Sequence, residues 1–140
     1  MMKLLHSADW HLDAPMVGKD EAQAAFLRAQ LRKVPEKVAK LCKQEDCRLL
    51  LLSGDLFDGE YTKESFHAVA SALRDAGVPV FIAPGNHDCA TPGSIWAKPI
   101  FPRNVHIFRS PKVEKFSFDE LGVDVYGYAF VSPEMTDCPL

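Results

Sequence analysis

Three short apolar segments of the chain each run into a cluster of polar residues, and this pattern constrains the fold more than any other feature. Each segment is only a few residues long, which is typical of a strand buried on both faces of a sheet. Polar residues at the carboxyl ends of neighbouring parallel strands meet at one edge, where open α/β sheets bind ligands. The segments and their clusters are 3–7 with Asp9-Trp10-His11, 48–53 with Gly54-Asp55-Leu56-Phe57-Asp58, and 78–83 with Gly85-Asn86-His87-Asp88.

Helix-forming sequence lies between these predicted strands. Good helix formers and apolar side chains at helical spacing favour helices there, with a break expected near Pro35. Thr62 is a suitable N-cap for the last helix, and Gly77 stands where that helix should end. The alternation of strand and helix predicts a parallel sheet with right-handed crossovers, which is the α/β class. The predicted helices are residues 20–33, 36–45 and 63–75.

The sequence changes character after Asp88, where prolines become frequent and no helix is predicted. Three short runs beyond this point are expected to form strands, and a turn at 118–122 joins the last two into a hairpin. Residues 131–140 have no clear element, and we expect the whole of 1–140 to be a single domain. The three predicted strands are residues 105–108, 113–118 and 123–128.

Charge and composition narrow the classes of partner. The net charge is −3 and the isoelectric point is about 5.9, so the broad basic surface of many nucleic-acid-binding proteins is not expected. No apolar run approaches the roughly 20 residues that span a membrane, and no signal peptide is recognisable, so we expect a cytoplasmic location without membrane contact. Free thiols are expected at all four cysteines, which are Cys42, Cys47, Cys89 and Cys138.

Asp9 and His11 are the candidate ligands of the first cluster. In an extended segment residues two apart point the same way, so this carboxylate and this imidazole should face one point. Such a pair suits a first-row divalent metal ion. The competing interpretation is an ordinary loop acid and a surface histidine.

The second cluster offers Asp55 as a carboxylate that could bridge two metal ions. Gly54 before it allows the backbone to approach a ligand closely. Asp58 is expected to form the turn or to accept a hydrogen bond from behind a metal ligand. A plain turn is the alternative interpretation of this Gly-Asp pair.

The third cluster combines a neutral oxygen ligand, Asn86, with a titratable ring, His87, and a carboxylate, Asp88. A neighbouring carboxylate can fix the orientation and tautomer of a histidine. His87 could then donate to a phosphate oxygen or to a leaving oxygen. The alternative is an Asn-containing turn after Pro84-Gly85.

Taken together, the three clusters resemble those of the calcineurin-like metallophosphoesterases. Two segments resemble the DNA-repair exonuclease branch of this family, which includes the SbcD-like nuclease subunit. They are residues 5–15, Leu-His-Ser-Ala-Asp-Trp-His-Leu-Asp-Ala-Pro, and residues 52–58, Leu-Ser-Gly-Asp-Leu-Phe-Asp. The resemblance covers residues 1 to about 130. It implies a metallophosphoesterase-type mixed sheet flanked by helices, as the front half of a four-layer α/β/β/α sandwich.

The resemblance also implies roles for the clustered residues. Asp9 and His11 would bind a first metal ion, Asp55 would bridge two ions and Asn86 would bind the second. His87 would contact the scissile phosphate and assist the leaving oxygen, with Asp88 supporting it. The family usually holds two Mn²⁺ ions, which activate water for in-line attack on a phosphodiester.

The family's downstream histidines have no counterpart here, because His6, His67 and His106 lack the expected Gly-His-x-His context. We therefore expect a first site that binds Mn²⁺ weakly and a second that is mostly empty. We also expect an incomplete domain with exposed sheet surface, which favours a homodimer or other self-association.

Three functions remain open from the sequence. The first is metal-dependent phosphodiester hydrolysis of the DNA exonuclease kind, with DNA and an SbcC-like ATPase subunit as partners. The second is a phosphoesterase for a small substrate, such as a nucleotide or phosphoprotein, which the lack of a basic stripe keeps open. The third is a non-catalytic fragment or interaction module.

Overall fold

A computed structural model describes residues 1–137 and 139, so the expectations for Cys138 and for the end of segment 131–140 fall outside the described residues. The elements are β1 Leu4–Ser7, α1 Glu21–Leu31, α2 Val34–Gln44, β2 Leu49–Leu52, α3 Lys63–Ala76, β3 Val80–Ile82, the short 3-10 helix η1 Ile95–Ala97, β4 Val105–Ile107, β5 Glu114–Phe118 and β6 Val123–Gly127. Each predicted helix and strand is present, with ends shifted by a few residues.

A four-stranded parallel sheet is the centre of the molecule, with strand order β1-β2-β3-β4. Each new strand adds to the same side, so the chain winds across the sheet in one direction. Strands β5 and β6 pair in an antiparallel way and form a separate two-stranded hairpin. The α/β class is confirmed.

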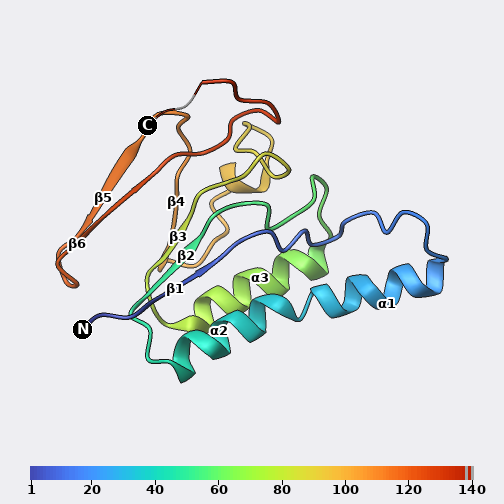
Figure 1. Ribbon diagram of the computed structural model, residues 1–140, viewed down its shortest axis with the longest axis horizontal. Helices are drawn as coiled ribbons and strands as arrows, with labels where there is room; N and C mark the ends of the chain where they lie inside the picture. Colours follow the sequence, from blue (N-terminus) through green and yellow to red (C-terminus); the bar gives the residue numbers. More distant parts are fainter. Residues whose placement is uncertain (138, 140) are drawn as a thin grey trace.

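Helices α2 and α3 cover one face of the sheet, while α1 extends beyond its edge (Figure 1). The space between this face of the sheet and the helices is filled by the main apolar core. Alternate strand residues such as Leu50 and Val80 pack there with Val69 and Leu73 of α3. The break between α1 and α2 falls just before Val34, with Pro35 in the first turn of α2. That position tolerates proline because the first amides of a helix have no partner inside it.

The β5–β6 hairpin packs on the opposite face of the sheet (Figure 1). Phe81 of β3 lies at the centre of this second core, with its ring 5.8 Å from that of Phe116 in the hairpin. His106 of β4 stacks on Phe81 at 4.9 Å, so it is a packing residue of this layer. The sheet is therefore held between helices and a hairpin.

Two details of the fold differ from the sequence-based expectation. Strand β1 is an edge strand whose residues alternate between exposed and half-buried, so His6 is exposed and bonds Ser53 Oγ at 2.7 Å instead of lying in a buried strand. The proline-rich stretch contains η1, whose Trp96 is completely buried. Its indole N–H donates to the Asp88 carbonyl, which ties this stretch to the third polar cluster.

No helix among residues 1–137 and 139 is long and apolar enough to cross a membrane. Of the cysteines in this part of the chain, Cys42 and Cys47 are buried, Cys89 is half-buried, and all are free thiols.

Candidate metal centre

The three polar clusters meet at the carboxyl edge of the sheet, as the sequence predicted. Backbone hydrogen bonds continue the β1–β2 pairing into the loops, since Asp9 N donates to Gly54 O at 3.0 Å and His11 N donates to Asp55 O at 2.9 Å. These bonds position the first two clusters side by side.

The backbone at the candidate ligands is left-handed, with φ of 56° at Asp9, 46° at His11 and 51° at Asp55. Our expectation that Asp9 and His11 converge because they lie in an extended segment is therefore wrong in its geometry. They converge through tight left-handed turns, which non-glycine residues adopt at a cost of roughly 1–2 kcal/mol each. Such strain is characteristic of functional sites where the surroundings hold the backbone in place.

Gly54 and Gly85 allow the second and third loops to touch. A Cβ added at Gly54 would lie 2.6 Å from Gly85 Cα and 2.9 Å from Ala83 O, and the φ of Gly54 is +81°. The close approach expected at Gly54 is thus to the neighbouring loop. It brings Asp55 against the third cluster, where His87 N donates to Asp55 Oδ1 at 2.9 Å.

Asp9, His11 and Asp55 form a set that fits one divalent ion. Their ligand atoms all lie within 4.8 Å of one another, and His11 Nε2 is 3.9 Å from Asp9 Oδ1 and 4.0 Å from Asp55 Oδ2. Atoms at about 2.1 Å from an octahedral ion are about 3.0 to 4.2 Å apart, so this spacing suits an ion between them. Two carboxylates and one imidazole suit a divalent metal ion.

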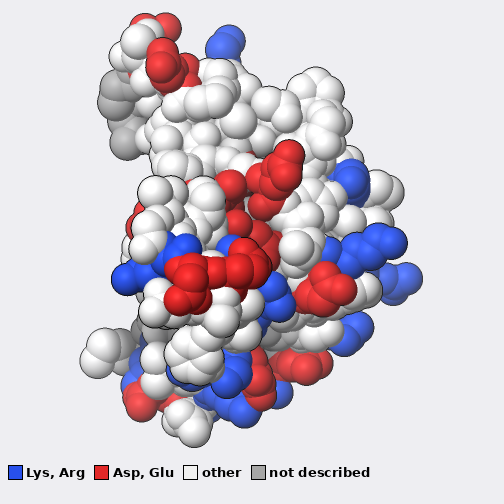
Figure 2. Space-filling view, turned by 90° about the vertical axis from the view of Figure 1, so that its right-hand side faces the viewer, with Lys and Arg blue, Asp and Glu red and all other residues white. Residues whose placement is uncertain are grey.

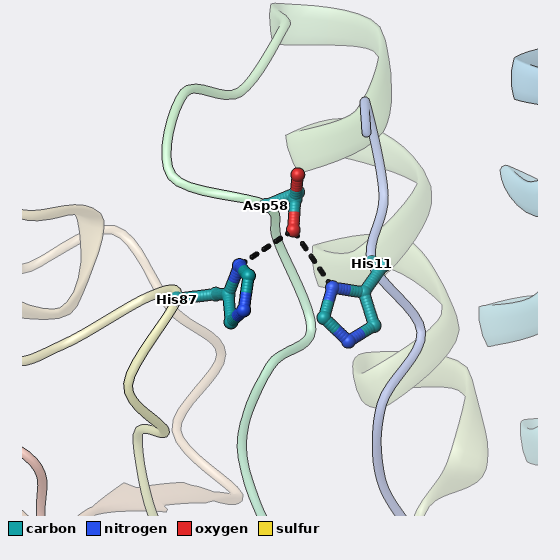
Figure 3. A group of neighbouring side chains, drawn as sticks. All are labelled: His11, Asp58 and His87. Carbon is teal, nitrogen blue, oxygen red and sulfur yellow. Dashed lines mark hydrogen bonds and ion pairs between the residues drawn. The ribbon is translucent and has the colours of Figure 1, made fainter. Parts of the chain in front are cut away.

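Asp58 orients His11 for this role. The Asp58 Oδ1 atom lies 2.8 Å from His11 Nδ1, so the Nδ1–H donates to the carboxylate and Nε2 keeps its lone pair toward Asp9 and Asp55 (Figure 3). This hydrogen bond raises the pKa of His11 above its usual 6.5. Burial of the ring lowers the pKa, and the negative charges of Asp58, Asp55 and Asp9 raise it further.

The same oxygen of Asp58 also holds His87. His87 Nδ1 lies 2.8 Å from Asp58 Oδ1, and the two histidine rings meet edge to face with centroids 4.9 Å apart (Figure 3). The His87 side chain is 48% exposed, so its Nε2 edge is available to a bound molecule. A ring held at Nδ1 and open at Nε2 can donate a proton or a hydrogen bond from Nε2 when both of its nitrogens are protonated.

The side chain of Asp88 is bound by backbone amides, and its expected support of His87 stays a prediction. Its buried carboxylate accepts backbone N–H groups of the two adjoining loops at 2.8 to 3.3 Å. Burial raises the pKa of Asp88, and these four donors partly offset that rise by favouring the charged form. Asp88 therefore fastens the loops together, and the donors are Asp55, Leu56, Phe57 and Gly85.

The second candidate metal position stays a prediction. Asn86 lies on the same loop as His87 with an exposed side chain. Within the described residues the other histidines lie elsewhere: His67 is exposed on α3, while His6 and His106 have the partners described above. Asp55 and Asn86 remain the residues that could bind a second ion.

Asp13 has a positioning function that the sequence did not indicate. Its carboxylate accepts from Thr62 N at 2.7 Å and Ser65 Oγ at 2.8 Å, which fastens the loop after His11 to the start of α3. The sequence indicated one half of this contact, because Thr62 was predicted to be the N-cap of α3. The distant Asp13 partner could not be inferred from local spacing.

Comparison with known proteins agrees with this geometry. A relative from Bacillus subtilis (strain 168), named "Uncharacterized metallophosphoesterase YhaO", is 30% identical over 143 residues, which cover 92% of this chain and 34% of the relative. The chain thus spans about a third of the length of that relative. The profile of the family described as calcineurin-like phosphoesterase matches residues 2–133. The chain therefore belongs to the calcineurin-like phosphoesterases, a membership that implies metal-dependent hydrolysis of phosphoesters.

Proposed function

We propose that this chain carries a Mn²⁺-dependent phosphodiesterase site of the DNA exonuclease kind. The observation that supports it most is the Asp58 carboxylate, which holds one histidine toward the Asp9–Asp55 ligand set and a second, open histidine beside it. One histidine is thereby placed to bind metal and the other to act on the substrate.

The residues divide the chemistry between them. Asp9, His11 and Asp55 would hold a first ion, and Asp55 with Asn86 a second. Ions at these places would supply positive charge against the phosphate oxygens. The loops held by Asp88 keep these ligands in position.

His87 is the proposed proton donor. The oxygen of a water molecule bonds to phosphorus, the bond from phosphorus to the leaving oxygen breaks, and His87 Nε2 gives its proton to that oxygen. The proton released by the water goes to solvent. In this step His87 starts as the imidazolium, with Nδ1–H beside Asp58 and the transferred proton on Nε2, and ends as the neutral ring with its proton on Nδ1; Asp58 holds its orientation.

The proposal of DNA as substrate rests on the amino-acid sequence around the first two motifs, which resembles the DNA-repair exonuclease branch. An SbcC-like ATPase subunit and a cytoplasmic location belong to the same proposal. The charge of −3 and the mixture of acidic and basic side chains on the face shown in Figure 2 favour a second candidate, a phosphoesterase for a small substrate such as a nucleotide.

Hydrolysis of bis-p-nitrophenyl phosphate with and without Mn²⁺ tests the activity. We expect turnover that requires Mn²⁺ and is lost in His87→Ala, while His67→Ala, which removes an exposed histidine of α3, behaves like wild type. Turnover that is unaffected by His87→Ala would contradict the role of His87. Mn²⁺ binding without turnover would favour the non-catalytic fragment.

Single-stranded oligonucleotides of increasing length then separate the two substrate classes. Turnover that rises with length supports a DNA exonuclease. Turnover of mononucleotides alone supports the small-substrate phosphoesterase.

A further inference from the structure

Helix α2 and the residues just before it carry a dense group of basic side chains. Residues 28–43 contain six Lys or Arg residues and a single acidic residue, Glu36, although the chain as a whole has a net charge of −3. The four lysines of this segment are all exposed. The net charge therefore conceals a local basic surface, here called the lysine stripe, which consists of Lys33, Lys37, Lys40 and Lys43.

Helical spacing places most of the stripe on one face of α2. Lys33, Lys37 and Lys40 follow one another at intervals of four and three residues, which is the repeat of a single helix face. The opposite side of the helix packs into the molecule beside α3 (Figure 1). The buried residues of that side are Pro35, Ala39 and Cys42. The lysine stripe thus faces away from the rest of the molecule.

Most of the positive charge of the stripe is not neutralised within the chain. Lys40 Nζ pairs with Glu36 Oε1 at 2.6 Å, whereas the other three lysines have no carboxylate partner among the described residues. Lys33 Nζ donates to the neutral Gln30 Oε1 at 3.3 Å, which leaves its charge uncompensated. Like charges four residues apart, as at Lys33 and Lys37, destabilise a helix. These charges therefore suit an anionic partner better than they suit the fold itself.

The stripe begins at the edge of the sheet that carries the metal centre. Helix α2 leads into the start of β2, so its last turn lies near the amino edge of the sheet and its first turn near the carboxyl edge (Figure 1). Arg32, directly before the stripe, has its Nε atom 3.6 Å from Asp13 Oδ1, in the loop that follows His11. The stripe therefore runs from the neighbourhood of the metal centre across the helical side of the molecule.

The dimensions of the stripe match the backbone of DNA. Ten residues of helix separate Lys33 from Lys43, which is about 15 Å at a rise of roughly 1.5 Å per residue. One strand of DNA places a phosphate about every 3.4 Å along the helix axis, so the stripe lies along about four phosphates. Lysine side chains bind such phosphates as mobile point charges.

An anionic membrane surface matches α2 less well. Helices that lie in a membrane interface insert a whole apolar face between the lipids. The apolar face of α2 is already packed inside the molecule, and Leu41, 43% exposed, is the one large apolar side chain that this helix exposes.

We propose that the lysine stripe binds the phosphate backbone of duplex DNA beside the metal centre. The choice of DNA among polyanions rests on the proposed function. The stripe holds the intact part of the duplex while its end lies at the metal centre. The contact does not depend on base sequence, because it is made to phosphates alone.

Fluorescence anisotropy of a short labelled DNA duplex tests this inference, with EDTA present so that no metal-dependent cleavage occurs. We compare the wild-type chain with Lys33→Gln/Lys37→Gln, which removes two charges and keeps good helix formers in place. We expect the variant to bind about tenfold more weakly at low salt. The slope of log Kd against the logarithm of salt concentration should fall by about 2, because each lysine–phosphate contact contributes roughly 0.9.

Lys112→Gln/Lys115→Gln is the matched control. It removes the same number of charges from exposed lysines in and just before β5, which lies on the other face of the sheet (Figure 1). We expect its affinity for the duplex to stay within about twofold of the wild-type value, with the same salt dependence.

Two kinds of result would overturn the inference. The first is a wild-type chain that does not bind the duplex, or equal loss of affinity in both double variants. The second is binding to phosphatidylserine vesicles, but not to the duplex, that is lost in Lys33→Gln/Lys37→Gln, since the stripe would then contact membranes.

The test is separate from that of the proposed function, because EDTA removes the metal from the binding experiment. Mn²⁺-dependent turnover of bis-p-nitrophenyl phosphate by a chain that does not bind the duplex would overturn the role of the stripe and leave the metal centre intact. Duplex binding that depends on the stripe, without any turnover, would support the stripe and contradict the proposed hydrolysis.

Discussion

Asp58 couples the two histidines of the site through a single oxygen atom. The carboxylate accepts a hydrogen bond from His11 Nδ1 and lies 2.8 Å from His87 Nδ1 as an ion-pair partner, so the opposite nitrogen atoms of the two rings are oriented together. The sequence left Asp58 as either a turn former or an acceptor. Only the arrangement of three loops shows that it serves both rings.

Asp58→Asn should weaken this coupling while keeping the size of the side chain. An amide lacks the negative charge that attracts both Nδ1 atoms and accepts the His11 hydrogen bond less strongly, so we expect Mn²⁺ affinity and kcat/KM to fall by about 10- to 100-fold. Calorimetric Mn²⁺ titration and steady-state kinetics measure the two effects. Asp119→Asn, in the hairpin turn, is the control, and equal behaviour of the two variants would contradict the role of Asp58.

Gly54→Ala should disrupt the contact between the second and third loops. Gly122→Ala is a matched control, because Gly122 also has positive φ, +63°, but has nothing within 4 Å of an added Cβ. Backbone strain alone should lower the free energy of unfolding by about 1 kcal/mol at Gly122. The clash at Gly54 should cost about 2 kcal/mol more, measured by urea unfolding of the metal-free chain. An equal loss of unfolding free energy in the two variants would contradict a tight contact between the second and third loops at Gly54.

At the scale of elements, local signals predicted most of the fold. Apolar runs gave the strands, and Thr62 and Gly77 cap α3 as expected, with Gly77 at a φ of 70°. The short helix η1 was missed because one 3-10 turn has no periodicity to detect. The exposure of β1 was missed because an apolar run does not reveal which strand lies at the edge of the sheet.

The packing of the hairpin on the sheet should depend on pH through His106. Burial against Phe81 and Phe116 lowers the pKa of His106 below its unfolded value of 6.5. The unfolded chain then binds more protons between the two values, so this contribution is complete above pH 6.5 and is lost as pH falls through the folded value. The loss is at most about 1.4 kcal/mol per pH unit.

Urea unfolding of wild type and His106→Leu at pH 7.5 and pH 5 checks this expectation. The variant should lose less stability on acidification, because leucine does not titrate. The comparison must be between these two proteins, since the raised pKa of His11 changes stability in the opposite direction. Identical losses in both proteins would show that His106 does not titrate in this range.

At the scale of the molecule, the fold leaves apolar side chains uncovered on the hairpin side of the sheet edge. Leu4 of β1 is 48% exposed, and β1 has a paired neighbour on one side only among the described residues. Exposed apolar strand edges tend to pair with another copy. Self-association stays a prediction, and we propose the β1 edge as the surface through which two copies would meet.

Leu4→Lys should weaken this self-association. We expect the weight-average mass of the wild-type chain in sedimentation velocity to rise with concentration, and the lysine to raise the dissociation constant about tenfold or more, because two copies would bring like charges together at the edge. Leu41→Lys, which changes a leucine of α2 that is 43% exposed, is the matched control and should associate like wild type. A monomer at every concentration would contradict the prediction, and an equal effect of both lysines would place the contact elsewhere than on β1.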